Sequence, residues 1–346
     1  MISPQPLGGA FRSAAVLAAV GLLLPLTACG GAKSTQPPPP PQDTTPRWQQ
    51  AAVFGGPAVW FSVAFTIGGR AYVGTGYDLG NAFWQYDPDG NTWTRRADFP
   101  GTARGAAVAF SIGGRGYIAT GYTAASDSRF SDLWEYDPTA DRWTERAPIP
   151  AATRDHAAAF AIGQRGYVVG GMTCGGPDCR ALSEVWEYDP SSDRWTRRTD
   201  APQEITGAAV FVLNGVGYLA AGGVGALDAG GASTVLWAYD PQTDTWTSKA
   251  DLPGAARYRA AGFALNGQGY VGTGLRPTAA GSVGALADLW EYDPAGNAWT
   301  RNVDFTGTPR GAAVAFALGA RAFIGTGGSP NGQTFTTLRD FWTWTP

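Results

Sequence analysis

Four arginines recur at one position of a sequence repeat, six residues before a phenylalanine that marks each copy. An acidic residue recurs in the same four copies, two residues before a tryptophan. Guanidinium groups bind carboxylates and phosphates through paired hydrogen bonds, so these arginines could clamp an anionic ligand. The alternative is a structural ion pair, because arginine and acid occur together or not at all. The residues are Arg104, Arg154, Arg257 and Arg310, with Asp132, Glu184, Asp288 and Asp340.

Six other residues break the repeat directly after the arginine position, where the other copies carry mainly glycine or alanine. Aromatic rings next to an acid and an arginine suit a sugar or a peptide, whereas the alternative is local packing where each copy begins. His156 is the only histidine, and imidazole is a common general base. The candidate binding residues at these positions are Trp60, Phe61, Asp155, His156, Tyr258 and Arg259.

Three aromatic marks define the repeated unit, which is 45 to 53 residues long. A phenylalanine begins an apolar stretch that ends in glycine, as in FSIGGRGYIATG from Phe110. A tyrosine precedes Asp-Pro, and a tryptophan follows seven residues later, as Trp143 follows Tyr136. Proline presets a turn dihedral, and the Asp, Asn and Gly residues after it complete a short hairpin. The marks therefore predict short strands joined by tight turns.

Composition narrows the class of protein. The chain has 49 glycines, 25 prolines and 14 tryptophans, which favours many short strands over helices. A net charge of -3 argues against a nucleic-acid partner, since such partners require a basic surface.

Strands that end in Gly-Gly or Thr-Gly, together with the tyrosine and the tryptophan at this period, resemble kelch repeats. The resemblance runs from Trp48 to the C-terminus and implies an all-β fold, a six-bladed kelch β-propeller with four strands per blade. We name these strands a to d from the central axis outwards. The sequence stops at FWTWTP, with Trp344 at the tyrosine position and no sixth d strand after it, and Trp48 has no a, b or c strand before it. We therefore expect the N-terminal strand around 47–51 to join the last blade and close the ring, with the propeller spanning 46–346.

The length of the repeat varies almost entirely between strands b and c. Tyr72 and Tyr86 are 14 residues apart, whereas Tyr117 and Tyr136 are 19 apart and later blades give 21 or 22. These b–c loops emerge beside the d–a connections, so one face of the propeller is elaborated and is our predicted binding surface. The recurrent arginine and acid lie at this same edge, about 10 Å apart across strand b, where long side chains could meet.

Outside the cytoplasm, two cysteines this close in sequence form a disulfide more readily than a metal site. Cys174 and Cys179 in CGGPDC predict a small disulfide within a b–c loop, with metal binding as the alternative.

The N-terminus predicts export. The apolar stretch 14–26 is too short to span a bilayer and fits a signal peptide. It ends in LTAC, which resembles the lipobox of bacterial lipoproteins and implies cleavage after residue 28 and acylation of Cys29.

The N-terminal segments follow from that resemblance. We expect a lipoprotein signal peptide over 1–28, and an acylated cysteine and a proline-rich linker over 29–45. The lipid would be the only attachment to the membrane. The predicted location is the cell envelope, as an outer-membrane lipoprotein that faces the periplasm or the cell surface.

Propellers carry many unrelated activities, so the kelch resemblance leaves the function open. Our leading prediction is a monomeric, non-enzymatic recognition domain that needs no cofactor or metal and binds a protein, peptide or glycan. The alternative is a sugar mutarotase similar to periplasmic sialic-acid mutarotases, and a structural envelope scaffold is a third possibility. A copper-radical galactose oxidase is excluded, because one histidine cannot supply its pair of imidazoles.

Overall fold

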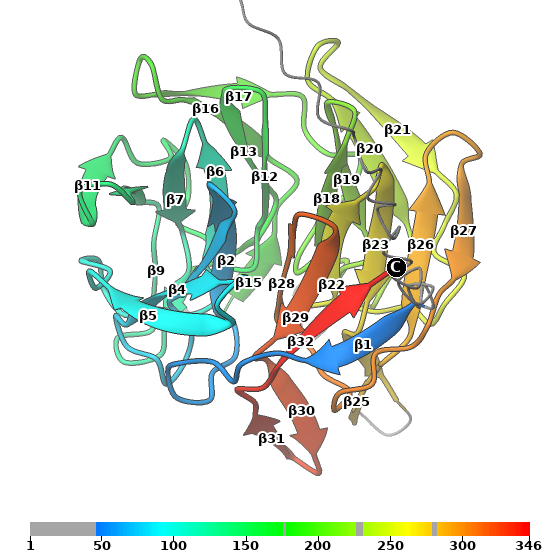
Figure 1. The fold of residues 1–346 in the computed structure, drawn as a ribbon. Coiled ribbons are helices and arrows are strands. Elements are labelled where there is room, and N and C mark those ends of the chain that lie inside the picture. The colour runs from blue at the N-terminus through cyan, green and yellow to red at the C-terminus, as the bar shows by residue number, and fades with distance from the viewer. Residues whose placement is uncertain (1–45, 176–177, 226–230, 279–281) are drawn as a thin grey trace, which may run out of the picture. The chain divides into compact units, whose positions relative to one another are not determined.

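The strands form six blades around a central axis, as the repeat predicts (Figure 1). The computed structural model describes residues 46–175, 178–225, 231–278 and 282–346. The predicted signal peptide, Cys29 and the proline-rich linker lie outside the described residues. Within the described ranges, no helix is long and apolar enough to cross a membrane.

Each blade is a four-stranded antiparallel sheet whose strands run in order from a to d. Blade 1 consists of β2 (Val63–Ile67), β3 (Arg70–Gly74), β4 (Phe83–Asp87) and β5 (Thr92–Arg96). Blade 2 consists of β6 (Val108–Ile112), β7 (Arg115–Ala119), β10 (Leu133–Asp137) and β11 (Arg142–Arg146). Blade 3 consists of β12 (Ala158–Ile162), β13 (Arg165–Val169), β16 (Val185–Asp189) and β17 (Arg194–Arg198).

The other three blades follow the same order. Blade 4 consists of β18 (Ala209–Leu213), β19 (Val216–Ala220), β20 (Leu236–Asp240) and β21 (Thr245–Lys249). Blade 5 consists of β22 (Ala261–Leu265), β23 (Gln268–Gly272), β26 (Leu289–Asp293) and β27 (Ala298–Arg301). Blade 6 consists of β28 (Val314–Leu318), β29 (Arg321–Gly325), β32 (Phe341–Thr345) and β1 (Arg47–Gln50).

The variable b–c loops of four blades fold into small two-stranded hairpins. Their strands are β8 (Tyr122–Thr123) with β9 (Ser128–Arg129), β14 (Met172–Gly175) with β15 (Asp178–Ala181), β24 (Leu275–Pro277) with β25 (Val283–Ala285), and β30 (Gly328–Asn331) with β31 (Thr334–Thr337). The loop-length variation in the sequence therefore corresponds to these hairpins.

The N-terminal strand closes the ring, which confirms the prediction. β1 lies beside β32 (Figure 1) and pairs antiparallel with it. In this register Trp48 is opposite Trp344. Trp48 is buried, its ring centroid lies 4.9 Å from that of Phe305, and its Nε1 donates a 3.3 Å hydrogen bond to the Val303 carbonyl. The two ends of the described chain therefore share one hydrophobic core.

Neighbouring blades pack through aromatic rings, which bury large apolar areas and prefer edge-to-face contacts. Phe83 of blade 1 is fully buried, with its ring centroid 4.8 Å from that of Tyr136 and 4.9 Å from that of Trp143 in blade 2. A Cβ on Gly116 in blade 2 would lie 2.1 Å from the Phe65 ring, so this contact requires glycine. The aromatic marks of the repeat are thus the inter-blade core.

A hydrogen-bonded turn explains why the tyrosine and the tryptophan stay seven residues apart. Asp193 adopts a positive φ of 51° and accepts the Tyr188 hydroxyl at 2.7 Å and the Ala147 amide of the preceding blade at 3.0 Å. Trp195 Nε1 donates to the carbonyl of the same Ala147 at 2.8 Å. This clamp recurs in five blades, around Asn91, Asp141, Asp193, Asp244 and Asn297.

Asp193→Ala should destabilise the protein by about 2 kcal/mol, because the turn loses its acceptor and alanine is strained at positive φ. Asp193→Asn is the matched control, since two other blades carry asparagine at this position. We expect its cost to stay within about 0.5 kcal/mol. Urea unfolding followed by tryptophan fluorescence measures both values, and equal losses for the two variants would contradict the clamp.

Candidate functional site

The four recurrent arginines form buried ion pairs within their own blades. Arg257 is fully buried, and its Nη1 and Nη2 lie 2.7 and 2.6 Å from the two carboxylate oxygens of Asp288. Its Nε donates to the Ala255 carbonyl and its Nη1 to the Thr273 carbonyl, so the side chain crosses the end of strand b. The equivalent pairs are Arg104–Asp132, Arg154–Glu184 and Arg310–Asp340.

These pairs favour the structural ion pair over the anion clamp. Their guanidinium groups bind carboxylates inside the protein and have almost no exposed surface. Burial alone would raise the pKa of Asp288, but the hydrogen bonds and charge of Arg257 outweigh burial and lower that pKa below its usual value. The four arginines therefore stabilise the face of the propeller that carries the b–c loops and the d–a connections, which we call the loop face.

A closed ring of backbone hydrogen bonds surrounds the mouth of the central channel. One residue from each blade donates its amide to the carbonyl of the equivalent residue in the preceding blade, over distances of 2.7 to 3.2 Å. All six residues have positive φ, a region that favours glycine. They are Phe61, Ala106, His156, Gly207, Arg259 and Ala312. We call this set the mouth ring.

Large and small side chains alternate around the mouth ring. The rings of Phe61 and His156 meet edge to face, with centroids 5.0 Å apart. Arg259 lies over the Phe61 ring, with its Cζ 4.5 Å from the centroid, and its Nη2 is 3.3 Å from His156 Nε2. The structure thus brings together three of the predicted binding residues in the lining of a cavity of about 120 Å³.

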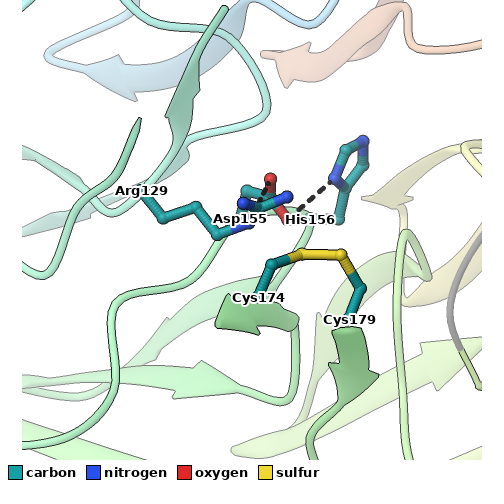
Figure 2. Close-up of a disulfide and its surroundings, with 5 residues drawn as sticks. All are labelled: Arg129, Asp155, His156, Cys174 and Cys179. Carbon is teal, nitrogen blue, oxygen red and sulfur yellow. Dashed lines mark ion pairs between the residues drawn. A yellow bond between two sulfur atoms is a disulfide. The ribbon is translucent and has the colours of Figure 1, made fainter. Parts of the chain in front are cut away.

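Asp155 connects the mouth ring to the blade 2 hairpin (Figure 2). Its carboxylate is buried, with one oxygen 3.2 Å from His156 Nδ1 and the other 3.1 Å from Nε of Arg129 in β9. Burial lowers the pKa of His156, and the charge of Arg259 adds to this effect while Asp155 opposes it. The histidine is therefore neutral at pH 7.

The predicted disulfide joins Cys174 and Cys179, which face each other in the hairpin of β14 and β15 (Figure 2). The base of this hairpin is attached to the site, because the backbone of Met172 exchanges hydrogen bonds of 2.8 and 3.0 Å with that of Asp155. Within the described residues, no group of three His, Cys, Asp or Glu side chains could hold a metal ion.

An aromatic cleft opens between blades 1 and 2 on the loop face. It has a volume of about 670 Å³, and its lining includes Trp60, Tyr77, Asp78, Arg104 and Tyr122. We call it the blade 1–2 cleft. Its aromatic walls contact each other, since the centroid of the Tyr77 ring lies 5.9 Å from that of Trp60 and 6.5 Å from that of Tyr122.

The sequence pattern identified Trp60 in this cleft but missed Tyr77 and Tyr122. Both follow the glycine that ends strand b, as in GTGY and ATGY, whereas other blades carry Met172, Gly223, Leu275 or Gly328 there. Trp60 pairs with Tyr77 across blade 1. The tyrosines could have been found as candidates from the way they break the repeat at the position after strand b. Tyr258 pairs with Leu275 in blade 5 and does not line the cleft.

A third cavity, of about 470 Å³, follows the central channel. The six a strands and the residues just before them line it, mostly with alanine and other apolar residues, and Ser62, Thr66 and Ser111 add hydroxyl groups. Among the described residues, no charged side chain lines this cavity, in contrast to the mouth ring and the blade 1–2 cleft. The groups that could recognise a polar ligand therefore gather on the loop face.

Six four-stranded blades closed by the N-terminal strand define a β-propeller, and comparisons assign its family. The family model described as the KLHDC2/KLHL20/DRC7 Kelch-repeats domain matches residues 33–222, and the chain belongs to the kelch-repeat proteins. The solved structure titled "Structure of YjhT" is similar with a TM-score of 0.73 and 17% sequence identity, over 84% of this chain and 96% of that chain. At that identity the likeness shows the fold. No protein with a curated description matches the sequence.

Proposed function

We propose that this protein is a non-enzymatic recognition propeller that binds a neutral glycan in the blade 1–2 cleft. The cleft itself is the observation that carries the proposal. Its volume of about 670 Å³ is typical of small-molecule sites, which are mostly apolar with a few placed polar groups. Tryptophan and tyrosine rings provide flat apolar surface for the C–H face of a sugar, and their N–H and O–H groups provide hydrogen bonds.

The charges around the cleft favour a neutral ligand over an acidic one. Arg104 lines the cleft but is held by Asp132, and Arg129, whose Cζ lies 4.9 Å from the centroid of the Tyr122 ring, is held by Asp155. Asp78 is exposed and would repel an anion, while its carboxylate can accept hydrogen bonds from sugar hydroxyls. Burial raises the pKa of Tyr77, so its phenol remains a hydrogen-bond donor at neutral pH.

The lipobox resemblance supports a location at the outer membrane for this binding activity. A lipid on Cys29 followed by a proline-rich linker would hold the propeller away from the outer membrane, where glycans of the envelope are accessible. The cysteine pair of β14 and β15 is consistent with an extracytoplasmic location, because disulfides persist in oxidising compartments.

Sugar mutarotase activity is the alternative, and it needs an acid–base group that reaches the sugar. His156 is poorly suited to that role, because its two ring nitrogens face Asp155 and Arg259 at 3.2 and 3.3 Å and its side chain is only 9% exposed. A carboxylate of the cleft, such as that of Asp78, would have to act instead. Anomer exchange faster than in buffer would favour the enzyme over the binding protein.

Thermal shifts with neutral and acidic oligosaccharides test the proposal. A neutral ligand at a hundred times its dissociation constant should stabilise the purified protein by about 2.7 kcal/mol. Tyr122→Met and Tyr77→Leu should each weaken binding at least tenfold, because they remove an aromatic wall of the cleft. Both replacements occur at the same position of other blades, as Met172 and Leu275, so the scaffold should accept them.

Met172→Leu is the matched control, since it changes the equivalent position away from the blade 1–2 cleft and should leave affinity unchanged. Three results would contradict the proposal: no response to any neutral saccharide, equal or tighter binding of acidic saccharides, or affinity that survives both cleft variants. A response to cationic peptides alone would assign the aromatic walls to cation–π binding instead.

A further inference from the structure

We propose that His156 is a pH-sensitive latch that controls the blade 1–2 cleft. In its neutral form it holds Arg259 and Phe61 over the channel mouth, and protonation releases them and weakens ligand binding in the cleft. The part of this inference that concerns the ligand rests on the proposed function. The latch itself rests on the contacts of a single side chain.

The hydrogen bond between Arg259 and His156 requires a neutral imidazole ring. A guanidinium can only donate, so the 3.3 Å contact from Arg259 Nη2 makes His156 Nε2 the acceptor. The proton of the neutral imidazole is then on Nδ1, which faces Asp155 Oδ1 at 3.2 Å. Protonation would place a second N–H on Nε2 and set two donors and two like charges against each other.

Burial and the two nearby arginines oppose a second proton on the ring, whereas Asp155 favours it. Asp155 faces Nδ1, Arg259 faces Nε2, and Arg129 binds the other oxygen of the same carboxylate. Phe61 covers the histidine ring edge to face, so protonation would also bury charge against an apolar surface. In the protonated state the imidazolium would lie between Asp155 and the cationic Arg259, and the one carboxylate of Asp155 would face two cations, His156 and Arg129.

Two chains of contacts connect the latch to the cleft walls. Phe61 packs on Trp60 and Tyr77, with centroid distances of 4.8 and 5.3 Å. On the other side, Asp155 holds Arg129, whose guanidinium lies over Tyr122. Trp60 and Tyr77 thus contact a direct partner of His156, and Tyr122 is connected to it through Arg129 and Asp155. Release of the latch would therefore change the shape of the cleft. A ligand that prefers the latched form would then bind less tightly at low pH.

The sign of the pH dependence follows from burial. The pKa of His156 is lowered in the folded protein, first by burial. Stability from the neutral ring is therefore complete above the unfolded pKa of about 6.5 and is lost as the pH falls from there through the folded pKa. Loosening of the mouth and loss of affinity should follow the same titration.

The single histidine allows a direct test on the untagged full-length protein. NMR of histidine-labelled protein should show one imidazole that titrates below pH 6.5, in the Nδ1–H tautomer, and the aromatic signals of the cleft should shift with it. Arg259→Met should raise this pKa and Asp155→Asn should lower it. A role in packing alone would not produce these opposite shifts. An imidazole that titrates near 6.5 and does not respond to either variant would overturn the latch.

The ligand arm uses the neutral saccharide found in the thermal-shift screen. Affinity should fall at least tenfold between pH 7.5 and pH 5.0, and less than twofold in His156→Gln, whose side-chain oxygen can still accept a hydrogen bond from Arg259. Binding that does not depend on pH in the unaltered protein would overturn the control of the cleft. If no saccharide binds at any pH, the proposed function fails, while the NMR titration still decides whether the latch exists.

Discussion

Deletion of Arg47–Ala51 abolishes the cooperative unfolding of the propeller, and this is the largest effect that we expect. The deletion removes the four residue pairs between β1 and β32 and exposes Trp344, which is fully buried in the closed ring. It also removes the 2.9 Å hydrogen bond from the Ala51 amide to the Phe341 carbonyl. The remaining edge of blade 6 would present unpaired backbone groups to solvent.

Calorimetry and tryptophan fluorescence measure the result. We expect a broad transition or an aggregated protein in place of a single sharp melting transition. A protein that begins at residue 46 is the matched control, because it keeps β1, and it should melt like the longer chain. Sharp melting of the deletion variant at an unchanged temperature would show that blade 6 needs only three strands.

The second largest effect should come from Arg257→Met, which we expect to cost about 3 kcal/mol. The substitution leaves the carboxylate of Asp288 without its buried partner, which costs more than the loss of the contacts alone. The double variant Arg257→Met/Asp288→Leu should cost less than the sum of its two single variants, because it removes both charges. Arg276→Met, at an exposed arginine, is the control and should change stability by at most about 0.5 kcal/mol.

The stabilisation by the Arg257–Asp288 ion pair should fall as the pH is lowered. Arg257 lowers the pKa of Asp288 in the folded protein, so the stabilisation is complete above the unfolded pKa of about 3.9 and disappears as the pH falls through the folded pKa. Urea unfolding of the four proteins of the cycle at pH 7 and pH 3 measures both effects. If the losses of stability at pH 7 were additive, Arg257 and Asp288 would not stabilise each other, and the ion-pair prediction would be wrong.

The fold was predictable because each blade repeats the same local information. The turn after Tyr136, the glycine at 116 and the seven-residue step to Trp143 are short-range patterns that the copies of the repeat reinforce. Closure by the strand of Trp48 could be inferred by counting which marks lacked partners. The ion pairs were also visible in outline, since Arg257 and Asp288 recur with their equivalents in four blades or are absent together.

The site was less predictable, because it is built from breaks in the repeat that only the folded ring brings together. Trp60 precedes strand a of blade 1 and Tyr77 follows its strand b, while Tyr122 follows strand b of blade 2. His156 and Arg259 are 103 residues apart in the chain, and their contact follows from their equivalent places in the mouth ring. Arg129 carried no sequence indication, since it lies in a hairpin of variable length.

The mouth ring has a consequence for how such a protein can acquire new specificities. Its amides and carbonyls are satisfied by backbone partners around a closed circuit, and although positive φ favours glycine at every position, one molecule already places Phe, Ala, His, Gly and Arg in it. At these six equivalent positions the backbone hydrogen bonds therefore do not depend on which polar or apolar side chain is present. Exchange of these side chains among blades would permute the pattern of charge and shape above the channel without altering the framework, so the ring behaves as a set of interchangeable display positions.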